Sequence, residues 1–490
     1  MSLSALKNHL RRTSALEQAA GVLSWDQEAI MPTGGAGQRA EQLGAMAAVI
    51  HDYQSDPRIA EWIDAIDNKE LSAFDQRNIA EAKRSYDRAT KLPADLAEAL
   101  AKGAATGQSI WVDARKKGDF KAFAPALTEM VNLKRREAEA LTDDGDLYDA
   151  LLDEFEPGAR VADLSPLLES LRPDLTHLRQ AIAEKGLAAN QLAANAFPAA
   201  DQLSLAQKIA DKLGYDLTRG RIDTVTHPFC SGTGDDVRIT TRTDESDPFN
   251  CLYSTIHEVG HALYAQGAPD AFLPAADYCS MGVHESQSRF WENQIARSRP
   301  FMDWLHPAMT EAFGDAAPAS ADALYQAVNN VETGFIRTEA DEIHYNLHIL
   351  LRFELERDLI SGDLDVSDLE AEWNMRFERD FGRVVTDPAM GVLQDVHWSA
   401  GLFGYFPTYS LGNIYAACLD EAMRAEMPNR DEMVRQGETA PILSWLRANI
   451  HEHGRVLTAP ELIEQATGKP PSAAPLVAYL KDKFGTLYDL

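Results

Sequence analysis

Helical periodicity governs most of this 490-residue sequence and limits the folds open to it. In residues 1–205, apolar residues recur every three or four positions, as in Leu164, Leu168 and Leu171. This spacing is the pattern of an amphipathic helix. Alanine, a strong helix former, is common there, and the helical pattern returns from about residue 248 to the end. We therefore predict a mostly α fold.

One short region interrupts the helical pattern. Arg221–Thr226 and Val237–Thr243 alternate polar with apolar residues and are rich in β-branched side chains, which is typical of strands. The segment between them, His227–Gly234, contains a proline and two glycines and is expected to be a loop. The sequence thus predicts one small β-sheet, placed just before the helix that begins near residue 248.

Charge and cysteine content restrict the partners and the setting of the chain. It carries 46 Lys and Arg against 76 Asp and Glu, a net charge of −30, which disfavours nucleic acid and anionic membrane surfaces as partners. The four cysteines form no Cys-x-x-Cys pair and are expected to be reduced thiols. No apolar run approaches the roughly 18 residues that span a bilayer, and the N-terminus has no leader-like apolar segment. We expect a cytoplasmic protein without a membrane partner.

The five residues His257-Glu258-Val259-Gly260-His261 carry the clearest chemical signal. Two histidines four positions apart on a helix project from the same face and can share one metal ion. Glu258 is rotated by about 100° from His257, so it can face a water molecule that the metal activates instead of binding the metal. The motif therefore predicts a metal centre with Glu258 as the general base.

The surrounding sequence favours a helix here. Asp247 is suited to cap the helix and Pro248 to its first position, whereas Gly267 is suited to follow its last turn. An apolar stripe between Leu252 and Leu263 lies on the side of the helix opposite the two histidines. One face of the helix is therefore expected in the core and the other at a functional site.

A catalytic zinc site needs a third protein ligand and one open position. Tyr264 and Gly267 stand where metzincins have their glycine and third histidine, which excludes that class. A glutamate from a following helix is the other common solution, and Glu285 is the candidate, 24 residues after the second histidine. His284 and Glu292 are rivals that the residue pattern alone leaves open.

Together with the segment His-Glu-Ser-Gln-Ser-Arg at 284–289, the His-Glu-Val-Gly-His motif resembles the thermostable carboxypeptidase (Taq-type) family of metallocarboxypeptidases. Further motifs that resemble those of the family follow in order over about residues 25–413. They are Trp25-Asp26-Gln27, Met31-Pro32, His227-Pro228-Phe229, Asp236–Thr240, Ile336–Asp341, Gly391–Trp398 and Gly404–Tyr409.

The resemblance implies a zinc enzyme, with cobalt as an alternative metal, that removes single residues from the C-termini of peptides. It also implies that Glu285 is the third metal ligand, beside His257 and His261. It further implies a large helical peptidase with a deep cleft, acting as a homodimer. We expect one catalytic domain over 1–490, with a helical half at 1–205 and the strands and active site at 206–490.

A carboxypeptidase must recognise a free terminal carboxylate, and the planar fork of arginine suits that group. Arg337 and Arg238 are the candidates because both lie inside family-like motifs. Arg352 and Arg289 are weaker candidates. Arg289 lies four positions after Glu285, so an ion pair between the two on one helix is its expected role.

Other residues in these motifs are candidates for contact with the substrate. The predicted strand Val237–Thr243 can add an extended peptide at its edge, and His227 on the preceding loop is expected to contact it. Gln394, which lies in the motif Gly391–Trp398, is also predicted to bind substrate. His397 and Tyr409 are candidates to donate hydrogen bonds to the oxyanion, and Tyr405 is an alternative to Tyr409.

Three functions remain open at this point. In the first, a metallocarboxypeptidase, Glu258 takes a proton from water and passes one to the leaving amine. The second is a zinc endopeptidase on a similar helical scaffold, which needs no anchor for a carboxylate. The third is a noncatalytic metal-binding or peptide-binding protein. An intact Glu258 argues against the third, because binding zinc does not require it.

Overall fold

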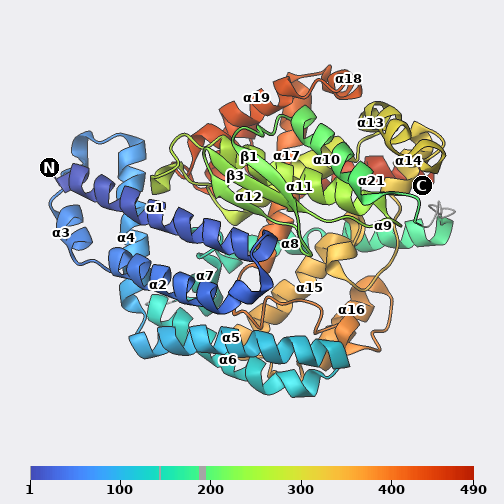
Figure 1. Ribbon diagram of the computed structural model, residues 1–490. Coiled ribbons are helices and arrows are strands. Elements are labelled where there is room, and N and C mark those ends of the chain that lie inside the picture. Colours follow the sequence, from blue (N-terminus) through green and yellow to red (C-terminus); the bar gives the residue numbers. More distant parts are fainter. Residues whose placement is uncertain (1, 143–144, 187–194) are drawn as a thin grey trace. The chain divides into compact units, whose positions relative to one another are not determined.

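The computed structural model describes residues 2–142, 145–186 and 195–490. Helices dominate these residues, and three strands form one small sheet (Figure 1). The predicted mostly α fold with a single small sheet is confirmed. The contacts between residues divide the chain into two compact units, and each unit combines separate segments of the sequence.

The first unit contains the sheet and the predicted metal-binding helix. It consists of Met1–Thr90, Ala189–Val328 and Ala416–Pro471. Its strands and main helices are α1 (Ser2–Ala29), α2 (Ala36–Gln54), α3 (Arg58–Asp64), α4 (Ala73–Lys91), α10 (Ala199–Leu213), β1 (Gly220–Thr224), β2 (Cys230–Thr233), β3 (Asp236–Thr241), α11 (Pro248–Gln266), α12 (Met281–Arg289), the π-helix Phe290–Ala296, α13 (Arg299–Phe313), α14 (Ala321–Val328), α18 (Arg430–Arg435), α19 (Ala440–Asn449) and α20 (Ala459–Thr467).

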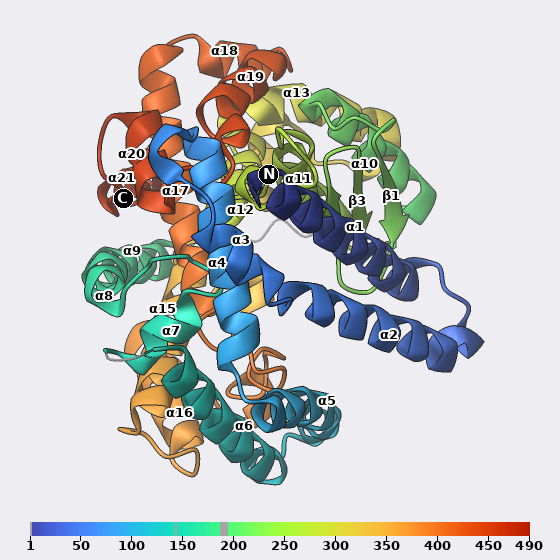
Figure 2. The ribbon, with the colours of Figure 1, turned by 90° about the vertical axis from the view of Figure 1, so that its left-hand side faces the viewer.

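The second unit is helical in its described residues. It consists of Lys91–Ala188, Asn329–Tyr415 and Ser472–Leu490, and the boundary at residue 415 falls inside α17 (Phe406–Glu426). Its other α-helices are α5 (Ala94–Lys117), α6 (Phe120–Leu141), α7 (Leu147–Leu152), α8 (Val161–Glu169), α9 (Arg172–Lys185), α15 (Glu342–Ser361), α16 (Leu369–Phe381) and α21 (Ala474–Tyr488). Helices α5 and α6 lie side by side in Figures 1 and 2.

The order of strands in the sheet is β1-β3-β2, with β1 parallel and β2 antiparallel to β3. The strands predicted near residues 221 and 237 are present, but β2 forms inside the segment predicted to be a loop. Because β3 is the middle strand, both of its edges are paired. The expectation that a peptide adds to β3 is therefore wrong, and β1 and β2 are the strands that pair on one side only within this sheet.

The sheet lies between two helices of the first unit. On one face, Thr241 accepts a hydrogen bond from Thr255 of α11 at 2.8 Å. On the other face, the guanidinium of Arg238 lies 4.3 Å from the ring centre of Trp25 on α1. Side chains alternate along a strand, so residues next to each other on β3 face different helices. The prediction of a sheet beside the metal-binding helix is confirmed.

Helix α11 begins and ends where the sequence predicts. The side chain of Asp247 accepts a hydrogen bond from the backbone N–H of Phe249 at 3.0 Å, and Pro248 is the first helical residue. The helix ends at Gln266, one residue before Gly267. The apolar stripe is buried, including Leu252 and Leu263, so the opposite face is left for the two histidines.

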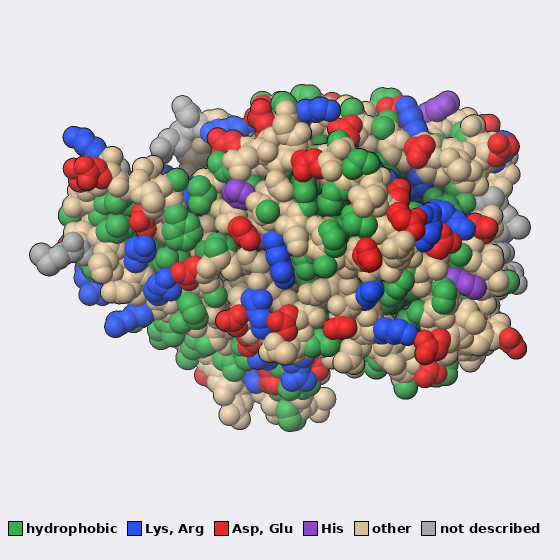
Figure 3. Space-filling view, turned by 90° about the horizontal axis from the view of Figure 1, so that it is seen from above, with side chains coloured by type: hydrophobic (Ala, Val, Ile, Leu, Met, Phe, Trp, Pro, Cys, Tyr) green, Lys and Arg blue, Asp and Glu red, His purple; other side chains and the backbone are tan. Residues whose placement is uncertain are grey.

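Charged side chains are dispersed on the face of the molecule that Figure 3 shows. On the face shown in Figure 3, basic and acidic side chains are interspersed among polar and apolar ones. Among the described residues, no helix combines the length and the apolar character needed to cross a membrane.

Candidate active site

A close approach of α11 and α12 creates the centre of the site. A Cβ atom on Gly260 would lie 2.5 Å from the Cα of Ser288 and 2.6 Å from the carbonyl oxygen of Gln287. Only glycine allows the two backbones to come so near. The glycine of the His-Glu-Val-Gly-His motif therefore sets the distance between the histidines on α11 and Glu285 on α12.

We expect Gly260→Ala to destabilise the fold and weaken metal binding. The added methyl group meets backbone atoms, and overpacking of this kind costs about 1–3 kcal/mol. Thermal unfolding and metal titration measure both effects. Gly44→Ala in α2 is the matched control, because nothing lies within 4 Å of a Cβ there, and a helical Gly→Ala change favours folding by about 0.5–1 kcal/mol. Equal behaviour of the two variants would contradict this account.

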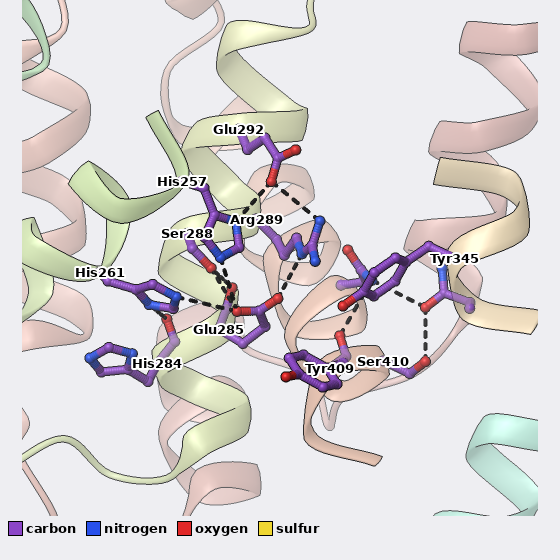
Figure 4. A network of polar contacts seen from close by, with 12 residues as sticks. His257, His261, His284, Glu285, Ser288, Arg289, Glu292, Tyr345, Tyr409 and Ser410 are labelled. Carbon is purple, nitrogen blue, oxygen red and sulfur yellow. Dashed lines mark hydrogen bonds and ion pairs between the residues drawn. The ribbon is translucent and has the colours of Figure 1, made fainter. Parts of the chain in front are cut away.

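Three donor atoms meet at this contact (Figure 4). The Nε2 atoms of His257 and His261 lie 3.6 Å and 3.4 Å from Oε2 of Glu285. All three donor atoms lie within 4.8 Å of one another. Bonds of about 2.0–2.2 Å to a tetrahedral zinc place its ligand atoms roughly 3.4 Å apart. The donor set therefore fits one such ion, with a fourth position left for water or substrate.

The other nitrogen of each histidine is fixed by a neighbour. Nδ1 of His257 lies 2.9 Å from Oε2 of Glu292, and Nδ1 of His261 lies 3.1 Å from the carbonyl oxygen of His284. Such partners hold metal-binding histidines in one tautomer with Nε2 free for the metal. Glu292 and His284, the rivals of Glu285 in the sequence, thus contact the two histidines and are not members of the donor group.

Glu285 is itself held by its own helix. Arg289 donates from Nε to Oε1 at 2.7 Å, and Ser288 donates to Oε2 at 3.0 Å. The predicted ion pair four positions apart is confirmed. Burial acts to raise the pKa of Glu285, but Arg289 and the histidines outweigh it and hold this pKa well below its usual range. The carboxyl group is therefore ionised, as a metal ligand must be.

Glu258 is buried on α11 and lies outside the donor group. Burial raises the pKa of its carboxyl group, and the neighbouring charges of His257 and His261 oppose that change. After burial, the charge of Glu258 also acts to raise the pKa of the Cys230 thiol on β2.

A cluster in the second unit, most of it buried, contains four of the predicted site residues, Arg337, Gln394, His397 and Tyr409. Asp395 accepts hydrogen bonds from Nε of Arg337 at 2.9 Å and from Nε of Arg352 at 2.7 Å. Burial acts to raise the pKa of Asp395, but the two guanidinium groups hold it far below the usual range. One carboxylate thus lies between two cations, so this ion cluster of three carries an excess positive charge.

Arg337 is oriented by its neighbours. Its guanidinium donates from Nη1 to the hydroxyl of Tyr345 at 3.3 Å and lies 4.9 Å from the ring centre of Tyr409. Its backbone N–H donates to the side chain of Gln394 at 2.8 Å, and the amide of Gln394 donates to the carbonyl of Phe335 at 3.0 Å. Gln394 thus holds the segment that carries Arg337.

His397 and Tyr409 lie together, with 3.3 Å between Nε2 and the hydroxyl oxygen. The pKa of His397 is lowered to about 4, chiefly by burial; the charge of Asp395 opposes this change, and the charges of Arg337 and Arg352 add to it. The imidazole is therefore neutral near pH 7. The ring of Tyr405 lies 5.6 Å from that of His397, so both tyrosines of the motif adjoin this histidine.

The remaining two candidates, Arg238 and His227, belong to the first unit and are not members of the donor group. Arg238 forms two hydrogen bonds with Asp236, at 2.7 and 2.8 Å, and stacks on Trp25 on the face of the sheet opposite α11. His227 is exposed on the loop between β1 and β2. The structure does not bring Arg238 together with the histidines of α11, so its role stays a prediction.

Sequence reasoning missed several contacts of the site. Asp395 was assigned no role, although it lies in the motif Gly391–Trp398. Its partner Arg337 is 58 positions away, and such a distant pair leaves no local pattern in the sequence. Glu292 was named only as a rival ligand. The π-helix Phe290–Ala296, which carries Glu292, also left no recognised signal, although such segments occur often at functional sites.

A helical chain with a His-His-Glu donor set on two packed helices, and a glutamate between the histidines, is a metallopeptidase. The chain belongs to the carboxypeptidase Taq (M32) metallopeptidase family, whose model matches residues 5–484. It is therefore a metallocarboxypeptidase, a peptide hydrolase that removes C-terminal residues.

Relatives of known identity resemble the chain over its whole length. Thermostable carboxypeptidase 1 of Thermus thermophilus is 40% identical, covering 98% of this chain and 97% of the relative. Carboxypeptidase 1 of Bacillus subtilis is 35% identical with the same coverage. Among solved structures, the M32 carboxypeptidase from Deinococcus radiodurans R1 superposes with a TM-score of 0.95 at 35% identity, covering 100% of both chains. Trypanosoma cruzi metallocarboxypeptidase 1 gives 0.96 at 32% identity, covering 99% of each.

Proposed function

We propose that the metal is zinc, with cobalt as an alternative, and that His257, His261 and Glu285 hold it. The observation that carries this proposal is the separation of 3.4–3.6 Å between the histidine Nε2 atoms and the glutamate oxygen. Nitrogen and carboxylate donors in a tetrahedral arrangement suit zinc. When bound, zinc acts as a Lewis acid that acidifies water and polarises the scissile carbonyl.

Glu258 is the general base in this proposal. Its carboxylate takes a proton from the attacking water and passes a proton to the leaving amine. This second proton transfer returns Glu258 to the carboxylate form for the next cycle. His397 and Tyr409 donate hydrogen bonds to the developing oxyanion, and the neutral state of His397 leaves one ring N–H for this purpose.

Arg337 binds the terminal carboxylate of the peptide. The support is the charge of the ion cluster, in which two guanidinium groups, Arg337 and Arg352, face one carboxylate, Asp395. An uncompensated positive charge in a buried environment raises the free energy of the protein, and a bound anion offsets it. Gln394 acts through Arg337 by holding its backbone. Arg238 is the second candidate for the carboxylate, but its guanidinium is already paired with Asp236.

We expect Arg337→Met to lower kcat/KM for free-acid peptides by about 30- to 5,000-fold, since losing one partner of a buried charge pair costs about 2–5 kcal/mol. Arg238→Met is the matched control, with the same change of shape at the second candidate. Steady-state kinetics on one peptide compare the two, and thermal unfolding checks the fold of both. A loss of kcat/KM in Arg238→Met alone would contradict this assignment and indicate that Arg238 binds the terminal carboxylate.

Dialysis against a chelator followed by titration with metal tests the proposed cofactor. One equivalent of Zn²⁺ per chain is expected to restore peptide hydrolysis, and Co²⁺ is expected to substitute for it. Restoration by Mg²⁺ alone, which prefers oxygen ligands in an octahedral arrangement, would contradict the zinc proposal.

We further propose that residues 1–490 work as one catalytic domain, that the enzyme is a cytoplasmic homodimer, and that its substrates are small peptides with a free C-terminus. The support for the dimer is the family resemblance. Light scattering during gel filtration measures the mass of the particle, and twice the chain mass is the expected value.

A further inference from the structure

A cavity of about 260 Å³ lies in the first unit beside the candidate metal ligands. We call it the β2 cavity, because Cys230, Ser231, Gly232 and Thr233 of β2 all line it. Neighbouring residues of a strand face opposite sides, so a lining of four consecutive residues indicates that the cavity runs along the edge of the strand. An edge is where an extended peptide can add main-chain hydrogen bonds.

Four aromatic rings form the wall facing β2. Tyr264, Tyr278, His284 and His451 all line the cavity, and His284 lies 4.9 Å from Tyr278 and 5.7 Å from Tyr264 between ring centres. Offset and edge-to-face packing at such distances favours a further aromatic ring. The volume of the cavity is just below the roughly 300 Å³ at which pockets for whole small ligands begin. A single side chain is therefore the occupant that fits it.

The β2 cavity reaches the metal site through one ring. The imidazole of His284 stacks on that of His261 with 4.4 Å between centres, and Figure 4 shows the two rings side by side. Because an extended chain advances by about 3.3 Å per residue, a side chain in the cavity belongs to a residue close to the bond that is cut.

The charges of the lining indicate on which side of that bond the residue lies. Among the described residues that line the cavity, Asp277 supplies the one permanently charged side chain, and its carboxylate is paired with Arg455 at 2.9 Å. The last residue of a peptide bears its own carboxylate, and none of these lining residues supplies a Lys or Arg side chain to hold it. Apart from Ser231 and Thr233 of β2, the remaining lining is apolar or aromatic, which suits an upstream residue without a free carboxylate.

Resting on the carboxypeptidase function proposed above, we propose that the β2 cavity is a specificity subsite. It binds an aromatic or long apolar side chain, one or two residues before the last peptide bond of the substrate. The backbone of that residue lies along the edge of β2, and its side chain packs against the rings of Tyr264, Tyr278 and His284. Met281, which also lines the cavity, adds a sulfur–aromatic contact.

Matched peptides test the subsite with the zinc-loaded enzyme. The peptides share one C-terminal residue and carry phenylalanine or glycine at each of the two preceding positions. At one of these positions, we expect kcat/KM for phenylalanine to exceed that for glycine by at least about 10-fold, since a single methylene group in a hydrophobic pocket is worth about 10- to 200-fold. Ala268→Leu fills the cavity and is expected to bring this ratio toward one while hydrolysis of the glycine peptide continues. Met281→Ala enlarges it and is expected to favour tryptophan over phenylalanine.

Each outcome separates this inference from the function on which it rests. If the wild-type enzyme releases no C-terminal residue from any peptide, the proposed function itself is wrong. If it releases residues at the same rate from phenylalanine and glycine peptides, the subsite is wrong and the function stands. Equal losses on both peptides in Ala268→Leu would show a purely structural effect and would also overturn the subsite.

Discussion

Replacing Glu258 by glutamine is expected to lower kcat by about 100- to 10,000-fold, the usual contribution of a general base. Glutamine keeps the shape of the side chain but cannot take a proton from water. Glu258 is outside the group of three donor atoms, so the variant is expected to keep its metal. Hydrolysis of a free-acid peptide and the metal content of the purified protein measure the two quantities together.

Two results would contradict the role of Glu258. Loss of metal together with activity would make Glu258 a ligand or a structural support of the ligands. Retention of activity with metal bound would require a different base. Glu311→Gln serves as the matched control, because Glu311 pairs with Lys208 at the surface, where an ion pair contributes little.

Replacing Glu285 by alanine is expected to abolish metal binding at concentrations that saturate the wild type, and activity with it. Glu285 supplies the one carboxylate of the donor group, so its removal leaves two neutral imidazoles to hold a dication. Glu292→Gln is the comparison, because Glu292 contacts Nδ1 of His257, the ring nitrogen that does not belong to the donor group. Loss of such a supporting partner costs about 10- to 100-fold in metal affinity or activity.

Calorimetric titration of the metal-free Glu285→Ala and Glu292→Gln variants with Zn²⁺ compares the contributions of the two glutamates to metal affinity. The expected order is a complete loss for Glu285→Ala and a partial loss for Glu292→Gln. The reverse order would make Glu292 the ligand, which is the rival that the sequence left open. Circular dichroism on the same samples excludes unfolding as the cause.

Local signals explain why so much of the first unit can be predicted from the sequence. Asp247, Pro248 and Gly267 act on the backbone within a few residues, so α11 begins and ends as predicted. The spacing of His257 and His261 places both on one helical face without any tertiary contact. Choosing Glu285 over its rivals required the family resemblance, because that choice depends on how α12 packs against α11.

Tertiary pairing explains what the sequence could not predict. Strand β2 contains Gly232, a residue type that is depleted in strands, and it forms because it pairs with an edge of β3. The same pairing places β3 in the middle of the sheet, so the unpaired edges belong to β1 and β2, and the cavity is lined by β2. In the second unit, Arg337 and Arg352 share Asp395, and no pattern in the sequence marks a carboxylate held by two cations.

Mass spectrometry of matched peptides tests the central claim most directly. Free-acid peptides and their C-terminal amides are incubated with the zinc-loaded enzyme and with Glu258→Gln. We expect stepwise loss of single C-terminal residues from the free acids alone, and no such loss with the variant at equal metal content. Internal cuts in both sets of peptides would contradict the account, because an enzyme that ignores the terminal carboxylate is an endopeptidase.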